Sequence, residues 1–339
     1  MNKKKSTLHF ATWLRACAAM MVLLCHLCNA APVRVIQMAA QFFNIGVPIF
    51  FLLSGFLFGY NGVKKPYHRW LWKRTKRIYF PMWLFMAILL CIHVGIGHHD
   101  RMIDWILMFF GMQGSAVRIY GAVHLWFITP ILICYLATPL IVWVIERLEK
   151  RGSRNLTIYC IGGACAVPAL LGLLPQAFWI AIYGPVIEFA FAFAAGRYYN
   201  RRTNERRKWI IGASAAIVIV FTVRLIARSV CDGTILYDRL IAWYTHVIGA
   251  MGICILFSIF LNNAKPPKAV KAISNYSFEI YLYHHMFITG PIVLCGILPH
   301  WTMDWIMITA VSFVAAWAAN RLLFQIENLS SRKNMRKRI

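Results

Sequence analysis

Apolar segments of roughly 20 residues recur along the whole of this 339-residue chain. A helix of about that length spans the hydrocarbon core of a bilayer. Only 14% of the residues are charged and 60% are hydrophobic, whereas about a quarter of a soluble domain is charged. The pattern predicts an all-α polytopic membrane protein of the cell membrane and leaves no segment long enough for a separate soluble domain.

We expect about ten transmembrane helices in a single integral membrane domain, residues 1–339. The predicted spans are 9–30, 38–60, 79–97, 122–145, 156–173, 178–196, 209–227, 240–261, 275–297 and 303–326. The apolar stretch 104–111 is too short to span, so it predicts an interfacial or re-entrant helix. The N-terminus also resembles a secretory signal peptide, but the length of its apolar run, and Arg15 and His26 within it, favour a retained first span.

Positive charge follows the boundaries of the predicted spans. With the N-terminus inside, 28 of the 36 Lys and Arg residues fall on the predicted cytoplasmic side and six on the outer side, while Arg15 and Arg321 lie within spans. This imbalance follows the positive-inside rule and predicts that both termini are cytoplasmic. The net charge of +25 is therefore explained by topology, and we expect no nucleic-acid partner.

We expect no metal cofactor. The ten cysteines show no regular spacing, and the Cys25-x-x-Cys28 pair has no second pair beside it, so these residues are interpreted as small hydrophobic side chains. His98, His99 and Asp100 could ligate a metal, but adjacent histidines in an exposed loop are usually only solvated.

Arg15 and His26 are ionisable residues inside the first apolar segment. Such a residue costs roughly 2.5–3.5 kcal/mol in a membrane helix and so needs a structural or functional reason. Their separation of eleven residues is three turns plus about 20°, which puts both on one face about 16 Å apart. This face is predicted to line a reaction site, with Arg15 toward the cytoplasm and His26 toward the outside.

The basic segment 73–77 precedes the third predicted span. On a helix, Arg74 and Arg77 share a face and could bind one phosphate group, because guanidinium donors form a planar fork. The alternative is a positive-inside anchor without further function. In the second span, Ser54 and Gly55 interrupt an aromatic run, which predicts either a site residue or close helix packing.

Two further polar features lie near the outer half of the predicted spans. His124 and Trp126 begin the fourth span on the side of His26, so His124 is expected near His26 or, alternatively, as a structural interfacial histidine. Residues 274–285 are dense in polar side chains, and such a segment is unlikely to face lipid. Ser277, Tyr281 and either His284 or His285 fall on one helical face, which predicts a cavity wall.

Together these motifs resemble the acyltransferase-3 family of integral membrane acyltransferases. The likeness rests on Arg-x10-His at 15–26, Phe-Phe-x-x-Ser-Gly at 50–55, Arg-x-x-Arg at 74–77, His-Leu-Trp-Phe at 124–127 and Ser-x-x-x-Tyr-Leu-x-His at 277–284. One departure from the family pattern lies on both sides of Arg15. The family often has Asp-x-Leu-Arg-Gly, whereas this chain has Thr12 and Ala16 in place of the acid and the glycine, which puts a role for an acid there in doubt.

The resemblance implies transfer of an acyl group, usually acetyl, from cytoplasmic acyl-CoA such as acetyl-CoA to a hydroxyl of a cell-surface or lipid-linked glycan. The expected partners are this donor, the glycan acceptor and membrane lipids. As a hypothesis, the donor-binding residues are Lys73, Arg74, Arg77 and Ser54; the catalytic residues are His26, Arg15, Tyr281 and His284; and the acceptor-binding residues are His124, Trp126 and Glu279.

Within this hypothesis, His26 serves as a general base or a transient acyl acceptor, because an imidazole titrates near neutral pH. A transporter or flippase of a lipid-linked sugar is the alternative. In that case the Arg74 and Arg77 pair would bind a pyrophosphate, and Glu188 in the sixth span would carry protons.

Overall fold

The computed structural model describes residues 8–113, 119–152, 154–164, 178–199 and 205–336. The structure is 81% helical and, within these ranges, contains no strand. The all-α polytopic fold predicted from the apolar runs is therefore confirmed.

Fifteen helical elements make up the described part of the chain. They are α1 (His9–Asn29), α2 (Arg34–Phe43), α3 (Gly46–Asn61), α4 (Tyr67–Gly95), α5 (Met102–Phe109), η1 (Val123–Phe127), α6 (Ile128–Lys150), α7 (Arg154–Ala164), α9 (Phe178–Arg197), α10 (Arg206–Cys231), η2 (Leu236–Ile241), α11 (Ala242–Phe260), α12 (Lys268–Asn275), α13 (Ser277–Ile288) and α14 (Trp301–Arg336).

Seven helical segments of the described residues are long and apolar enough to cross a membrane. They are His9–Asn29, Arg34–Asn61, Tyr67–Gly95, Val123–Lys150, Arg206–Cys231, Leu236–Phe260 and Trp301–Asn328. The chain is thus a multi-pass membrane protein. The count of about ten spans and the cytoplasmic position of the termini stay predictions, and part of the predicted span 156–173 lies outside the described residues.

The largest difference from the predicted spans concerns 275–297. Helix α13 ends at Ile288, and residues 289–300 form turns and bends without a helix. Gly290 and Pro291 explain this end, because proline has no backbone N–H and disfavours helical geometry in the residue before it. The short predicted helix over 104–111 is α5, which is only eight residues long.

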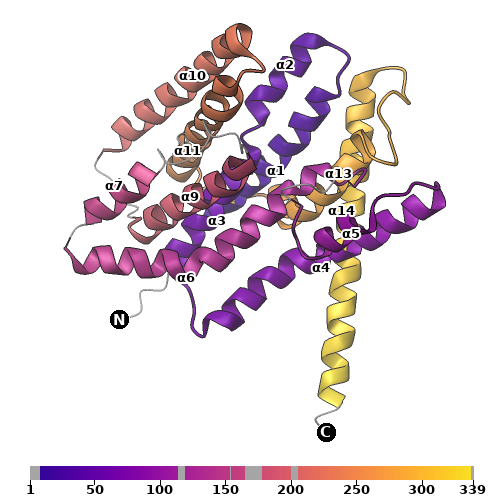
Figure 1. Ribbon diagram of the computed structural model, residues 1–339, viewed down its shortest axis with the longest axis horizontal. Helices are drawn as coiled ribbons and strands as arrows, with labels where there is room; N and C mark the ends of the chain where they lie inside the picture. The colour runs from indigo at the N-terminus through magenta and orange to yellow at the C-terminus, as the bar shows by residue number, and fades with distance from the viewer. Residues whose placement is uncertain (1–7, 114–118, 153, 165–177, 200–204, 337–339) are drawn as a thin grey trace.

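The helices are arranged so that α1 and α3 run through the middle of the structure (Figure 1). Helices α10 and α11 pack against each other at the upper left of this view, α4 and α6 cross its lower part, and α13 and α14 lie on the right. The last turns of α14 extend well beyond the other helices (Figure 1). The main core joins side chains from α1, α3, α4, α6 and α13.

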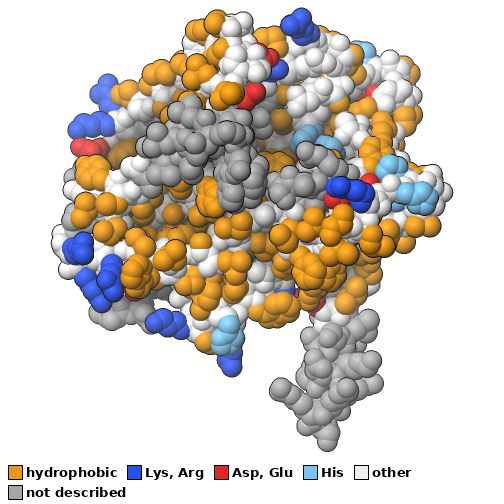
Figure 2. All heavy atoms as spheres, in the orientation of Figure 1, with side chains coloured by type: hydrophobic (Ala, Val, Ile, Leu, Met, Phe, Trp, Pro, Cys, Tyr) orange, Lys and Arg blue, Asp and Glu red, His pale blue; other side chains and the backbone are white. Residues whose placement is uncertain are grey.

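Hydrophobic side chains cover much of the outer surface as well (Figure 2). Large exposed examples include Val94, Met102, Leu136 and Val230, each more than 60% exposed. Soluble monomers rarely expose apolar area on this scale, whereas lipid-facing helices do. Lys and Arg lie mainly toward the edges of the face that Figure 2 shows.

Helices α3 and α9 approach each other more closely than side chains would permit. A Cβ on Gly55 would lie 2.2 Å from the backbone oxygen of Phe189, and one on Gly59 would lie 1.9 Å from that of Phe193. The two glycines are four residues apart, the spacing by which membrane helices bring backbones together. Helix packing therefore accounts for Gly55 in the Ser54-Gly55 motif.

We expect Gly59→Ala to lower the free energy of unfolding by about 1–3 kcal/mol, because the new methyl group must push two backbones apart. The measurement is equilibrium unfolding of the purified protein in mixed micelles. Gly95→Ala is the matched control, since no atom lies within 4 Å of its added Cβ. Equal stability of the two variants would contradict the close contact between α3 and α9.

Candidate functional site

A cavity of about 550 Å³ opens beside the N-terminal half of α1. Four cationic side chains line it: Arg15 from α1, and Arg74, Lys76 and Arg77 from α4. This is the end of the bundle that is predicted to face the cytoplasm. We name this space the cationic cavity.

The basic segment 73–77 is helical, because α4 begins at Tyr67 and not at the predicted boundary 79. Arg74 and Arg77 therefore do share a face, as the spacing predicts, and both line the cationic cavity. The guanidinium of Arg74 lies 4.8 Å from the centre of the Phe58 ring, and Lys76 forms an ion pair of 3.2 Å with Glu327. These contacts hold the cations beside the opening.

The opposite wall of the cationic cavity comes from α12, α13 and α14. It contains Ser277, Glu279 and Tyr281 from the polar segment 274–285, and Asn320 from α14. The Asn320 side-chain amide donates a hydrogen bond of 3.0 Å to Glu279 Oε1. Ser54 also lines the cavity. Ser277 and Tyr281 therefore line a cavity, as the helical spacing predicts, whereas His284 and His285 do not line it.

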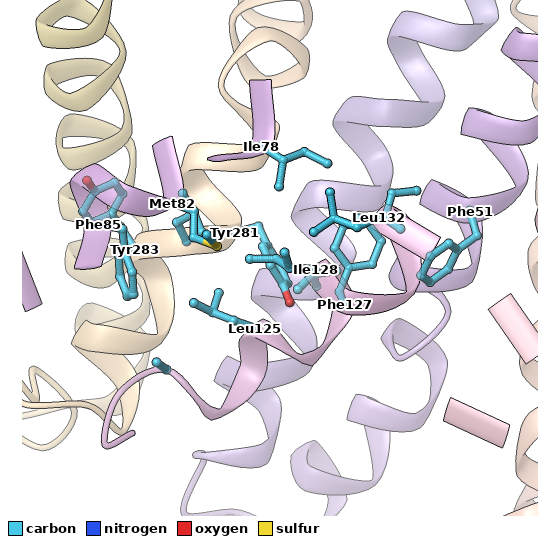
Figure 3. Close-up of a cluster of buried hydrophobic side chains, with 14 of the residues drawn as sticks. Phe51, Ile78, Met82, Phe85, Leu125, Phe127, Ile128, Leu132, Tyr281 and Tyr283 are labelled. Carbon is cyan, nitrogen blue, oxygen red and sulfur yellow. The ribbon is translucent and has the colours of Figure 1, made fainter. Parts of the chain in front are cut away.

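Tyr281 lies at the inner end of this wall, among the buried side chains Phe127, Ile128 and Leu125 (Figure 3). Its hydroxyl donates to the backbone oxygen of His124, and His124 Nε2 donates to the backbone oxygen of Tyr281 at 2.9 Å. This reciprocal pair joins α13 to η1. It also connects the cationic cavity to a group of histidines.

Four histidines, His26, His124, His284 and His285, form what we name the histidine cluster. The ring of His26 lies 5.1 Å from that of His284 and 5.0 Å from that of His285, between centroids. The ring of His124 lies 5.1 Å and 4.5 Å from the same two rings. His26 and His124 therefore lie near each other, as expected, because both rings contact the rings of His284 and His285.

Hydrogen bonds define which nitrogen of two histidines carries the proton. His124 Nε2 and His284 Nδ1 each face a backbone oxygen, so each must carry hydrogen. In the neutral rings, His124 Nδ1 and His284 Nε2 then hold free lone pairs. Both atoms are buried and have no hydrogen-bond partner among the described residues. Such nitrogens can accept a proton, which suits general-base chemistry.

Not every candidate residue lies at these two places. His26 belongs to the histidine cluster and does not line the cationic cavity with Arg15. The face of α1 that carries both residues therefore contributes to two separate sites and not to the single site that was predicted. Lys73 is exposed on α4 and does not line the cavity, whereas Lys76 does. Trp126 is 37% exposed on η1, away from the cavity. Glu188 is buried in α9 and lines neither site.

Tyr135 and Asn320 line the cationic cavity and were not predicted. Asn320 carries a usable signal, since it is a polar residue beside Arg321 inside a predicted span. His285 was one of two options that the helical spacing left open. Tyr135 has no signal, because one tyrosine among apolar residues is ordinary in a membrane helix.

The fold and this pair of sites define a polytopic membrane protein with a cationic cavity at one end of α1 and buried histidines at the other. The model of the acyltransferase-3 family, described as an acyltransferase domain, matches residues 8–321. The chain therefore belongs to the acyltransferase-3 family.

A curated relative is named "Putative membrane-bound acyltransferase YfiQ", from Bacillus subtilis (strain 168). It is 28% identical over an alignment of 159 residues, and the match covers 43% of this chain. The chain spans 42% of the length of that relative. No solved structure matches the chain.

We expect Tyr281→Phe to lower the free energy of unfolding by about 1–3 kcal/mol, because the buried oxygen of His124 loses its donor. Equilibrium unfolding in mixed micelles measures the change. Tyr283→Phe is the matched control on the same helix: its hydroxyl is buried without a partner among the described residues, so its removal should be neutral or stabilising. Unchanged stability in Tyr281→Phe would contradict a stabilising bond between Tyr281 and the backbone of His124.

Proposed function

We propose that this protein is a membrane O-acyltransferase that moves an acyl group, acetyl in the first instance, from cytoplasmic acyl-CoA to a hydroxyl of a cell-surface or lipid-linked glycan. One observation carries the proposal. A cavity with three guanidinium groups and an ammonium group is connected, through Tyr281, to buried histidines with free lone pairs. Family membership supports acyl transfer over the alternative of a lipid-linked sugar flippase.

The cationic cavity is the proposed donor site. Coenzyme A carries several phosphates, and Arg74 and Arg77 offer planar donors that bind phosphate oxygens in pairs. Lys76 adds a flexible charge at the opening, where it now pairs with Glu327. Arg15 lies deeper along α1, where its guanidinium would position the thioester arm of the donor so that it extends toward the histidine cluster.

The histidine cluster is the proposed acid–base site. An unprotonated histidine nitrogen removes the proton of the acceptor hydroxyl, and the oxygen forms a bond to the thioester carbon. The carbon–sulfur bond then breaks, and the CoA thiolate leaves and takes up a proton. His26 and His284, with rings 5.1 Å apart, are the proposed base and its neighbour in proton transfer. In an alternative form of this mechanism, His26 first takes the acyl group from the donor and then passes it to the acceptor. Trapping of an acylated enzyme would reveal that form.

Arg74→Ala should weaken binding of acyl-CoA about 10- to 100-fold, the loss expected for charge-assisted hydrogen bonds to phosphate. Binding of radiolabelled acetyl-CoA to the purified protein measures it. Lys73→Ala is the matched control, because Lys73 is exposed on the same helix outside the cavity. Wild-type affinity in Arg74→Ala would rule out this donor site, and no binding by the wild-type protein would favour the flippase.

His26→Ala should abolish acylation of surface glycans in cells while acyl-CoA binding stays within about threefold of wild type, because the variant loses the base and keeps the donor site. Mass spectrometry of glycans measures the transfer. His99→Ala, a change of an exposed histidine outside the cluster, serves as the control. Full activity in a well-expressed His26→Ala protein would exclude His26 as the base or carrier.

A further inference from the structure

A third group of ionisable side chains lies at the C-terminal end of α4 and in the loop after it. His93, His98 and Asp100 each offer one ligand atom, and the three atoms lie within 4.8 Å of one another. His93 Nδ1 is 2.6 Å from Asp100 Oδ2, and His98 Nε2 is 3.4 Å from Asp100 Oδ1. We propose that these three residues bind one divalent transition-metal ion of the zinc class.

The charge of Asp100 is the first reason. Its side chain is only 6% exposed, and in the part of the chain that the structure describes its ion-pair partners are the two histidines. The nearest arginine in sequence, Arg101, is instead engaged with Asp104 at 2.9 Å. A buried carboxylate needs a positive partner, and a metal ion held between it and the two neutral imidazoles supplies one.

The ligand chemistry is the second reason. Imidazole and carboxylate groups are usual donors of zinc, and tetrahedral bonds of about 2.0–2.2 Å put such donors about 3.3–3.6 Å apart. The 3.4 Å between His98 and Asp100 already fits this range, and the 2.6 Å between His93 and Asp100 would have to widen by about 1 Å, which side-chain rotation can supply. His98 is 40% exposed, which leaves a solvent side for a water as fourth ligand.

The surroundings indicate a structural role for the ion. The Tyr120 ring lies 6.2 Å from that of His93 and 5.3 Å from that of His98, and its backbone N–H donates to Asp100 Oδ1 at 3.3 Å. The Tyr120 hydroxyl donates to the backbone oxygen of Gly290 at 2.8 Å. The ion would therefore join the end of α4 to the segment that leads into His124 and, through Tyr120, to the residues just after α13.

The test uses full-length protein in detergent, purified with a histidine-free tag and stripped with a chelator. Zinc is then titrated in, and bound metal per chain is counted by mass spectrometry. Wild type should bind one ion per chain and show a higher unfolding midpoint with zinc. His98→Ala should bind at least tenfold more weakly and lose this shift, while His99→Ala, which changes the neighbouring exposed histidine, should behave as wild type.

Each outcome decides the proposal. Equal zinc stoichiometry and equal stabilisation in His98→Ala, or no bound zinc in the wild type, would overturn it. Loss of binding in both His98→Ala and His99→Ala would move the site to other ligands and overturn it as stated. A cobalt-substituted sample adds a readout that needs no activity, since a tetrahedral site gives a strong visible absorption that His98→Ala should lack.

Discussion

The cost of an unpaired polar group in an apolar interior shapes this structure more than any other constraint. In a bilayer, a buried N–H, hydroxyl or charge finds its partner within the protein or not at all. The reciprocal bonds between Tyr281 and His124 show the result, because each residue satisfies the backbone of the other. The same pair determines where α13 meets η1, and so how the cationic cavity lies relative to the histidine cluster.

The close contact of α3 with α9 has a complementary origin. Membrane helices gain little from burying apolar surface against one another, so they associate through backbone proximity at small residues. Gly55 and Gly59 provide that proximity on α3, and the neighbouring Ser54 then faces the cationic cavity. One motif therefore contributes both to helix packing, through Gly55, and to the lining of the cavity, through Ser54.

The sequence was informative where one helix decides the geometry and weak where two distant segments meet. The faces shared by Arg74 and Arg77, and by Ser277 and Tyr281, follow from helical spacing, and all four residues line the cavity. By contrast, spacing along α1 could not show that Arg15 and His26 lie at separate sites, since that depends on which side chains of α13 pack against α1. The association of His93 with His98 and Asp100 was missed because the helix was expected to continue to 97, which hides the turn that brings them together.

The length of α14 has a consequence for how a donor could enter. From Trp301 to Glu327 this helix rises about 39 Å, more than the roughly 30 Å hydrocarbon core. Trp301 and Trp305 mark its other end as interfacial, since tryptophan prefers the headgroup level. We therefore expect the Lys76–Glu327 ion pair to lie at the depth of water and not of lipid tails. A charged molecule could thus reach the cavity directly from the aqueous phase, without crossing the leaflet sideways.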